Sequence, residues 1–209
     1  FRKSSFEALV TAFAEIGVSF TEADMPHYEV YNNRMWEMFE RGEIEKEHIY
    51  EERFRLYFAE RGIEADTAAF NRKYLYELAE GVNFMPHCAE LLRVLHGRVK
   101  VFILTNGDTY AQERRIEKSG FAPYFDGVFI SEQLGCKKPE KAFYDKVFSL
   151  IGEEYRGCTL MVGDSLSSDM QGGRNAGIPT CFYGKREKAD ARCDYVIEDL
   201  LELPPLLGI

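Results

Sequence analysis

The chain has no hydrophobic run long enough to cross a membrane. A transmembrane helix needs about 20 consecutive, mostly apolar residues, and charged residues interrupt every apolar stretch well before that length. The first residues, Phe1 to Ser5, lead into an amphipathic pattern and lack the features of a secretory signal. We therefore expect no membrane partner.

Paired cysteine motifs are also missing. No Cys-x-x-Cys spacing occurs, which excludes the common zinc-binding motifs, and the number of cysteines is odd. Reduced thiols in a cytoplasmic protein fit this pattern better than a disulfide framework. The five cysteines are Cys88, Cys136, Cys158, Cys181 and Cys193.

The chain has no surplus of basic residues. Its 26 Lys and Arg face 35 Asp and Glu, for a net charge of −9. Non-specific binding to a nucleic acid polymer needs a basic surface, so we exclude that class of partner. A small anionic substrate remains compatible, because its binding depends on the local field and not on the total charge.

Residues 1–82 contain no convincing strand. Apolar residues recur there at helical spacing in four stretches, and each stretch ends near a glycine. The four glycines are Gly17, Gly42, Gly62 and Gly81. The pattern predicts a small bundle of four helices with short connections.

From residue 83 onward, strand and helix patterns alternate. Apolar runs predict strands at 99–104, 127–130, 159–162, 180–183 and 195–197, and the segments between them include helices at 110–119, 140–151 and 169–176. Alternation of this kind implies a parallel sheet with helices on both faces. We predict an α/β protein with a doubly wound, Rossmann-like core over residues 83–209 and an all-helical cap domain over residues 1–82.

Polar residues follow the predicted strands at three places along the chain. Thr105, Asn106 and Gly107 come after the first strand, where a hydroxyl, an amide and a close backbone can hold phosphate oxygens. A plain strand-to-helix turn uses the same residue types. Lys138 precedes Pro139, which we expect to open a helix. Its ammonium could balance a phosphate or a carboxylate, although most lysines are simply solvated.

The third place holds two carboxylates. Asp164 follows the buried strand at 159–162, and Asp169 lies five residues further, near the expected helix start. Ligands of parallel α/β sheets bind outside the carboxyl ends of the strands, and Mg²⁺ prefers oxygen ligands. The pair is therefore a candidate Mg²⁺ site. The alternative is a turn residue followed by a helix cap.

In this order and spacing, the three motifs resemble those of the haloacid dehalogenase (HAD) superfamily, in particular phosphatases of subfamily I with a helical cap. Thr105-Asn106-Gly107 matches the second motif of that family, Lys138-Pro139 the third, and Gly163-Asp164-Ser165 with Asp169 the fourth. The likeness covers residues 84 to about 200. The subgroup that looks most similar is the pyrimidine 5′-nucleotidase-like phosphatases.

The resemblance implies Mg²⁺-dependent hydrolysis of a small phosphorylated metabolite through an aspartyl-phosphate. It implies that Thr105 and Lys138 act in catalysis, that Asn106 and Gly107 join them in binding phosphate, and that Asp164 and Asp169 bind the metal. Nucleoside 5′-monophosphates are the expected substrates, with phosphoglycolate or a sugar phosphate as alternatives. Dehalogenation is less expected, because dehalogenases resemble Ser-Asn where this chain has Gly163-Asp164.

The first motif of the family, an apolar strand ending in Asp-x-Asp-x-Thr, does not occur in the chain. Family members use its first Asp as the nucleophile, and its strand lies in the middle of the sheet. One hypothesis is that a segment of about 15 residues, one strand plus its motif, precedes Phe1. The other is a non-catalytic HAD-like protein that binds a ligand or partner. We favour the first, since a sheet without its central strand would leave two rows of backbone groups unpaired. The oligomeric state is not indicated.

Overall fold

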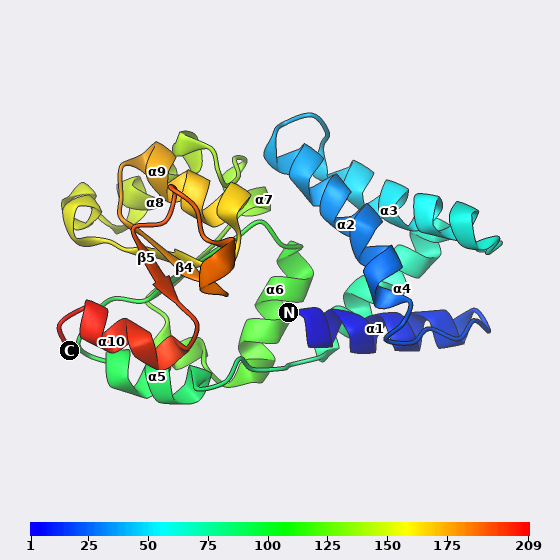
Figure 1. Cartoon of the computed structure of the whole chain (residues 1–209), viewed down its shortest axis with the longest axis horizontal. Coiled ribbons are helices and arrows are strands. Elements are labelled where there is room, and N and C mark those ends of the chain that lie inside the picture. The colour runs from blue at the N-terminus through cyan, green and yellow to red at the C-terminus, as the bar shows by residue number, and fades with distance from the viewer. The chain divides into compact units, whose positions relative to one another are not determined.

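The computed structural model describes all 209 residues, and these form two compact units (Figure 1). The first, here called the helical unit, comprises Phe1–Asn83 together with Tyr110–Ser119. The second, called the α/β unit, comprises Phe84–Thr109 and Gly120–Ile209. None of the helices combines the length and the apolar character that a membrane crossing requires.

The helical unit has the four predicted helices and a fifth from later in the chain. They are α1 (Arg2–Glu15), α2 (Met25–Glu40), α3 (Lys46–Arg61), α4 (Thr67–Glu80) and α6 (Thr109–Ser119). The predicted stops are confirmed at Gly17, just past α1, and at Gly62, which caps α3; both adopt positive φ angles that favour glycine. Asp66 caps α4 by accepting from the backbone N–H groups of Ala68 and Ala69.

Aromatic side chains fill the centre of the helical unit. Phe13 is fully buried and stacks on Phe20 with ring centroids 4.7 Å apart. Its ring also lies 4.6 Å from that of Phe70. Helix α1 packs on α4, and α2 packs on α3. The helical periodicity of the sequence therefore marks a real buried face in all four helices.

The α/β unit confirms the predicted alternation of strands and helices. Its strands are β1 (Phe102–Thr105), β2 (Gly127–Ile130), β3 (Met161–Gly163), β4 (Thr180–Tyr183) and β5 (Tyr195–Ile197). Its main helices are α5 (Cys88–Leu95), α7 (Ser131–Leu134), α8 (Lys141–Ile151), α9 (Gln171–Ala176) and α10 (Leu203–Leu206). Short helical turns occur at Ala122–Tyr124, Glu153–Cys158, Leu166–Met170, Arg186–Lys188 and Leu200–Glu202.

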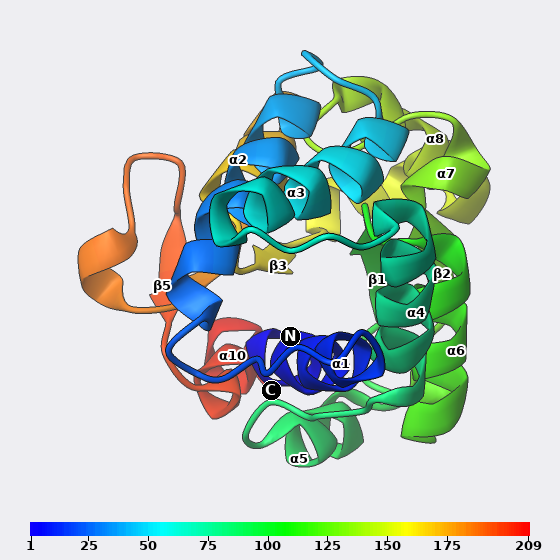
Figure 2. The same ribbon diagram turned by 90° about the vertical axis from the view of Figure 1, so that its right-hand side faces the viewer.

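All strand pairs are parallel, as the α/β class requires, and they fall into two sheets. Strand β1 pairs with β2, with Thr105 opposite Ile130. Strand β4 lies between β3 and β5. Strands β1 and β3 do not pair with each other, and Figure 2 shows β1 beside β2 and apart from β3. These are the two strands that the sequence predicts on either side of a further strand.

Several predicted elements begin later in the structure, among them β3 at Met161 and α9 at Gln171, and for two others the backbone explains why. The first strand begins at Phe102 and not at Val99, because the Val99 N–H closes the turn after α5 by donating to Leu95 and the Val101 N–H donates to Asp126. Pro139 does not open a helix. Helix α8 begins at Lys141, after a turn in which Glu140 N donates to the Lys137 carbonyl.

Replacing Phe13 by Ala should lower the free energy of unfolding by about 3–5 kcal/mol, since it leaves a cavity among packed rings. Val10→Ala, on an exposed position of the same helix, is the control and should change it by no more than about 0.5 kcal/mol. Urea denaturation followed by circular dichroism measures both. Equal effects of the two substitutions would contradict the assignment of Phe13 to the core.

Candidate active site

Asn106, directly after β1, links this strand to Lys138. Its side-chain Nδ2 donates to the Lys138 carbonyl over 2.9 Å, and its Oδ1 accepts from the Lys138 backbone N–H over 3.0 Å. The amide is buried and both its ends are occupied. Next to it, the Thr105 hydroxyl oxygen accepts from Gly107 N–H over 2.9 Å. The turn after β1 is thus held in one conformation, with the Thr105 hydroxyl at the strand's carboxyl end.

Lys138 is a buried cation whose ammonium has two partners. Only 7% of the residue is exposed. Its Nζ donates to the Leu104 carbonyl of β1 over 2.8 Å and to Asp169 Oδ1 over 2.6 Å. A buried charge needs such partners, because losing water costs several kcal/mol per ion. The structure therefore directs this side chain to the end of β1.

Asp169 lies on the single π-helical turn Leu166–Met170 that follows β3. Its Oδ1 accepts from Lys138, and its Oδ2 accepts from Ser165 N–H over 3.1 Å. A Cβ added at Gly163 would lie 2.2 Å from Oδ2. Glycine is consequently required at position 163, since the Asp169 carboxylate occupies the space that any larger side chain would need.

Asp164 differs from Asp169 in its surroundings. It follows directly after β3, is exposed to solvent, and its carboxylate makes no hydrogen bond or ion pair within the chain. Tyr183 at the end of β4 lies near it: burial raises the pKa of Tyr183, and the charges of Asp199 and Asp164 raise it further. Asp164 therefore keeps both oxygens available for a ligand.

The donor set fits Mg²⁺ better than a transition metal. No three His, Cys, Asp or Glu side chains gather into a group that could hold a metal ion by themselves. Mg²⁺ is commonly held by one or two carboxylates and keeps several waters. One free carboxylate at Asp164, beside the fixed Asp169, matches that chemistry.

Two buried groups beside the predicted residues were not expected from the sequence. Ser168 Oγ lies 3.5 Å from Asn106 Nδ2, which adds a contact between the turns after β1 and β3. The Tyr144 hydroxyl is buried without a hydrogen-bond partner, and burial together with the Asp169 charge raises the pKa of Tyr144. A Cβ at Gly172 would lie 2.2 Å from this hydroxyl. The Gly172-Gly173 pair was the one signal in the sequence that a bulky group approaches here.

Lys138→Met should destabilise the protein by about 3–5 kcal/mol, because it leaves the Asp169 carboxylate buried and unpaired. Adding Asp169→Asn removes that charge and should restore part of the loss. Chemical denaturation of both single variants and of the double variant measures the coupling. Strictly additive losses would show that the two side chains do not interact.

A family model described as haloacid dehalogenase-like hydrolase matches residues 2–177. Among curated proteins, the HAD-hydrolase YfnB of Bacillus subtilis is 32% identical, over 100% of this chain and 90% of its own. The pyrimidine 5′-nucleotidase YjjG of Escherichia coli is 33% identical, over 99% of this chain and 92% of its own. The pyrimidine 5′-nucleotidase PynA of Streptococcus pneumoniae is 37% identical, over 84% of this chain and 75% of its own.

Solved structures similar to this chain include one of the same relatives, YfnB. A crystal structure of YfnB bound to magnesium superposes with a TM-score of 0.93 and covers 100% of this chain and 93% of its own. The L-2-haloacid dehalogenase PA0810 has a TM-score of 0.73 at 16% identity, over 99% of this chain and 92% of its own, a likeness of fold alone.

Proposed function

The chain belongs to the haloacid dehalogenase-like hydrolase family, and from this premise we propose that it hydrolyses phosphomonoesters with the help of Mg²⁺. One observation carries the proposal. The Lys138 ammonium is fixed between the end of β1 and Asp169, and the segment after β3 that carries Asp169 also carries Asp164, a carboxylate that has no partner in the chain. A fixed cation at the carboxyl end of a parallel strand suits a transferring phosphoryl group.

Lys138 and the residues at the end of β1 would each make a different contact with the phosphate. The Lys138 ammonium would stabilise the negative charge that develops on the phosphoryl oxygens. The Thr105 hydroxyl and the Gly107 backbone would hold and orient these oxygens. Since the Asn106 side chain is occupied by Lys138, we assign it to positioning that lysine and leave phosphate contact at this residue to its backbone.

The metal would be held by Asp164, whose carboxylate is free, with Asp169 beside it. When bound, Mg²⁺ neutralises charge between the carboxylates and the phosphoryl oxygens. Lys138 and Ser165 occupy both oxygens of Asp169, so its share in binding would be to keep the turn after β3 in place and to orient a metal-bound water. The magnesium named for the YfnB structure supports this choice of ion.

The proposed reaction passes through an aspartyl-phosphate. The ester P–O bond breaks as a P–O bond to an aspartate carboxylate forms, and water then cleaves that acyl phosphate. No Asp-x-Asp-x-Thr motif occurs in residues 1–209, so the nucleophile is assigned to none of them. Dehalogenation is disfavoured by Gly163-Asp164, and the dehalogenases among the solved structures resemble this chain in fold alone.

Nucleoside 5′-monophosphates are the proposed substrate class. Two relatives, 33% and 37% identical to this chain over the matched residues, are named pyrimidine 5′-nucleotidases. Other relatives are named for sugar phosphates or related metabolites, over shorter matches, for example N-acylneuraminate-9-phosphatase. The longer matches favour nucleotides.

Asp164→Asn should lower Mg²⁺-dependent hydrolysis of p-nitrophenyl phosphate by about 100-fold or more, since it replaces the free carboxylate ligand. It should also weaken Mg²⁺ binding measured by calorimetry, a readout that is independent of turnover. Asp145→Asn, at a surface ion pair, is the matched control. The assay uses the protein at its natural full length. Retained activity, or hydrolysis that does not depend on Mg²⁺, would reject the metal assignment, and no hydrolysis at all would favour the non-catalytic alternative.

A substrate panel tests the proposed class. UMP, dUMP and dTMP should be hydrolysed with kcat/KM at least about tenfold above that of phosphoglycolate and of sugar phosphates. A tenfold ratio of kcat/KM corresponds to a difference of about 1.4 kcal/mol in transition-state binding. Release of inorganic phosphate measures each rate. Absence of turnover for every nucleotide, with turnover of another phosphomonoester, would reject the nucleotidase assignment and keep the phosphatase.

A further inference from the structure

Glu132 lies beside the turn Thr105–Asp108, here called the phosphate-binding turn. Strands β1 and β2 are parallel with Thr105 opposite Ile130, so the residues that follow the two strands leave the sheet at the same edge. Ser131 and Glu132 follow β2 directly and begin α7, just as the phosphate-binding turn follows β1. Ligands of parallel α/β sheets bind at this edge. Glu132 is therefore a carboxylate next to the candidate site to which the proposed reaction gives no role.

The carboxylate of Glu132 holds the residue at which this turn ends. Its Oε2 accepts from the Thr109 backbone N–H over 2.9 Å and also from the Thr109 hydroxyl. Hydrogen bonds to an ionised acceptor are stronger than those between neutral groups. Thr109 is the first residue of α6, and the first N–H groups of a helix have no acceptor within it. Glu132 thus supplies from α7 the acceptor that α6 cannot supply to its own first residue.

The chain leaves the α/β unit immediately after this contact. Thr109 belongs to the α/β unit, whereas Tyr110–Ser119 belong to the helical unit. Helix α6 is continuous across that point. A change in the position of the helix would consequently be transmitted to the phosphate-binding turn, unless the first residue of the helix were fixed. The contact with Glu132 fixes it.

The phosphate-binding turn is therefore held near both of its ends. The buried side-chain amide of Asn106 is bonded to the backbone of Lys138, and the far end is held through Thr109. Between these two anchors the Thr105 hydroxyl accepts from Gly107 N–H. A threonine hydroxyl also has a hydrogen to donate. A phosphate oxygen would thus meet a donor whose position is already fixed.

The same contact limits what the start of α6 can bind. A helix N-terminus attracts anions through its free N–H groups and its dipole. Here the carboxylate of Glu132 occupies the N–H of Thr109 and brings its own negative charge to that end of the helix. A phosphate would be repelled from this position, which leaves its binding to the turn before the helix and to the Lys138 ammonium.

We propose that Glu132 is a positioning residue, which fixes the phosphate-binding turn where the chain passes into α6 and makes no contact with the phosphate itself. The identity of the ligand rests on the proposed function, whereas the anchor rests on the two contacts with Thr109. Loss of the anchor should weaken phosphate binding and leave metal binding intact, because the segment after β3 carries Asp164 and Asp169.

Two substitutions of Glu132 separate the anchor from its charge. Glu132→Ala removes the acceptor, and it should weaken the binding of inorganic phosphate by about tenfold and raise KM for p-nitrophenyl phosphate to a similar extent, since small displacements of a positioned group are costly. Glu132→Gln keeps a neutral acceptor of nearly the same shape and should retain phosphate affinity within about threefold. Calorimetry on the full-length protein measures phosphate and Mg²⁺ separately, and Mg²⁺ affinity should be unchanged in both variants.

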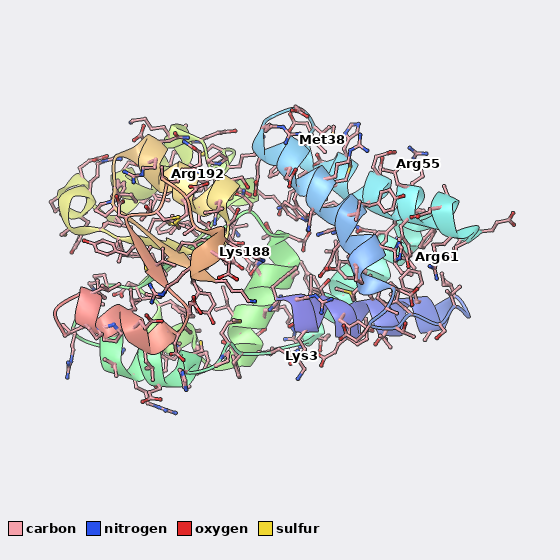
Figure 3. The ribbon with its side chains drawn as sticks, in the orientation of Figure 1. Lys3, Met38, Arg55, Arg61, Lys188 and Arg192 are labelled. Carbon is pink, nitrogen blue, oxygen red and sulfur yellow. The ribbon has the colours of Figure 1, made fainter.

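Asp24→Ala is the matched control. In the helical unit, Asp24 Oδ2 accepts from the backbone N–H and the hydroxyl of Thr21, over 2.9 and 2.8 Å, so the same two donors of a threonine meet one carboxylate oxygen. Arg61, at the end of α3 and labelled in Figure 3, adds an ion pair to Asp24 over 2.8 Å. Asp24→Ala should therefore lower Tm at least as much as Glu132→Ala does, and it should leave phosphate affinity unchanged.

Thr109→Ala tests the contact from its other side. It removes the hydroxyl donor and keeps the backbone N–H, so phosphate affinity should fall by about threefold. In a protein that already carries Glu132→Ala, the same substitution should have no further effect, because the acceptor is gone. Fully additive losses of affinity would show that the two side chains act independently and would overturn the proposal.

Phosphate affinity in Glu132→Ala within about twofold of the wild-type value would also overturn the proposal, as would an equal loss in Asp24→Ala. So would equal losses in Glu132→Ala and Glu132→Gln, since the charge and not the anchor would then matter. A protein that hydrolyses no phosphomonoester, yet binds phosphate and loses that binding in Glu132→Ala, would support the proposal and reject the proposed function. Mg²⁺-dependent hydrolysis with unaltered phosphate binding in the variant would do the reverse.

Discussion

The candidate site depends on the ion pair between Lys138 and Asp169. Strands β1 and β3 belong to different sheets and share no hydrogen bond, yet this pair ties the Leu104 carbonyl at the end of β1 to the turn after β3. Asn106 fixes the lysine backbone from the same side. Because the pair is buried, neither charge can be removed without exposing the other to an uncompensated cost. Side-chain contacts, and not backbone pairing, therefore hold the carboxyl end of β1 close to the turn after β3.

This constraint explains why glycines border the site. Gly163 stands where the Asp169 carboxylate leaves no room for a Cβ, and Gly172 stands where the Tyr144 hydroxyl does the same. Neither glycine has a positive φ. Both are needed for close approach and not for a special backbone conformation, so the Gly-Asp pattern around Asp164 reflects the packing of Asp169 as much as the binding of a ligand.

Patterns in the sequence predicted the elements better than their contacts. Periodicity located the four helices of the bundle, and glycines such as Gly17 and Gly62 marked their ends, because both signals are local. The start of β1 was misplaced, since the N–H groups of Val99 and Val101 donate to the Leu95 carbonyl and to Asp126, which no local pattern reports. Likewise, Thr105, Lys138 and Asp169 could be placed at strand ends. The engagement of the Asn106 amide by the Lys138 backbone, and the burial of Arg53 on a helix rich in charge, depend on partners distant in sequence.

The two buried cations show what a charged side chain is arranged to do. Lys138 is neutralised and hydrogen-bonded within the chain, so its ammonium is fixed before any ligand arrives, as stabilisation of a developing charge requires. Arg53 is oriented by rings and two amides but left without an acid and with a donor unsatisfied. The preorganised Lys138 ammonium therefore suits the chemistry common to all phosphomonoesters.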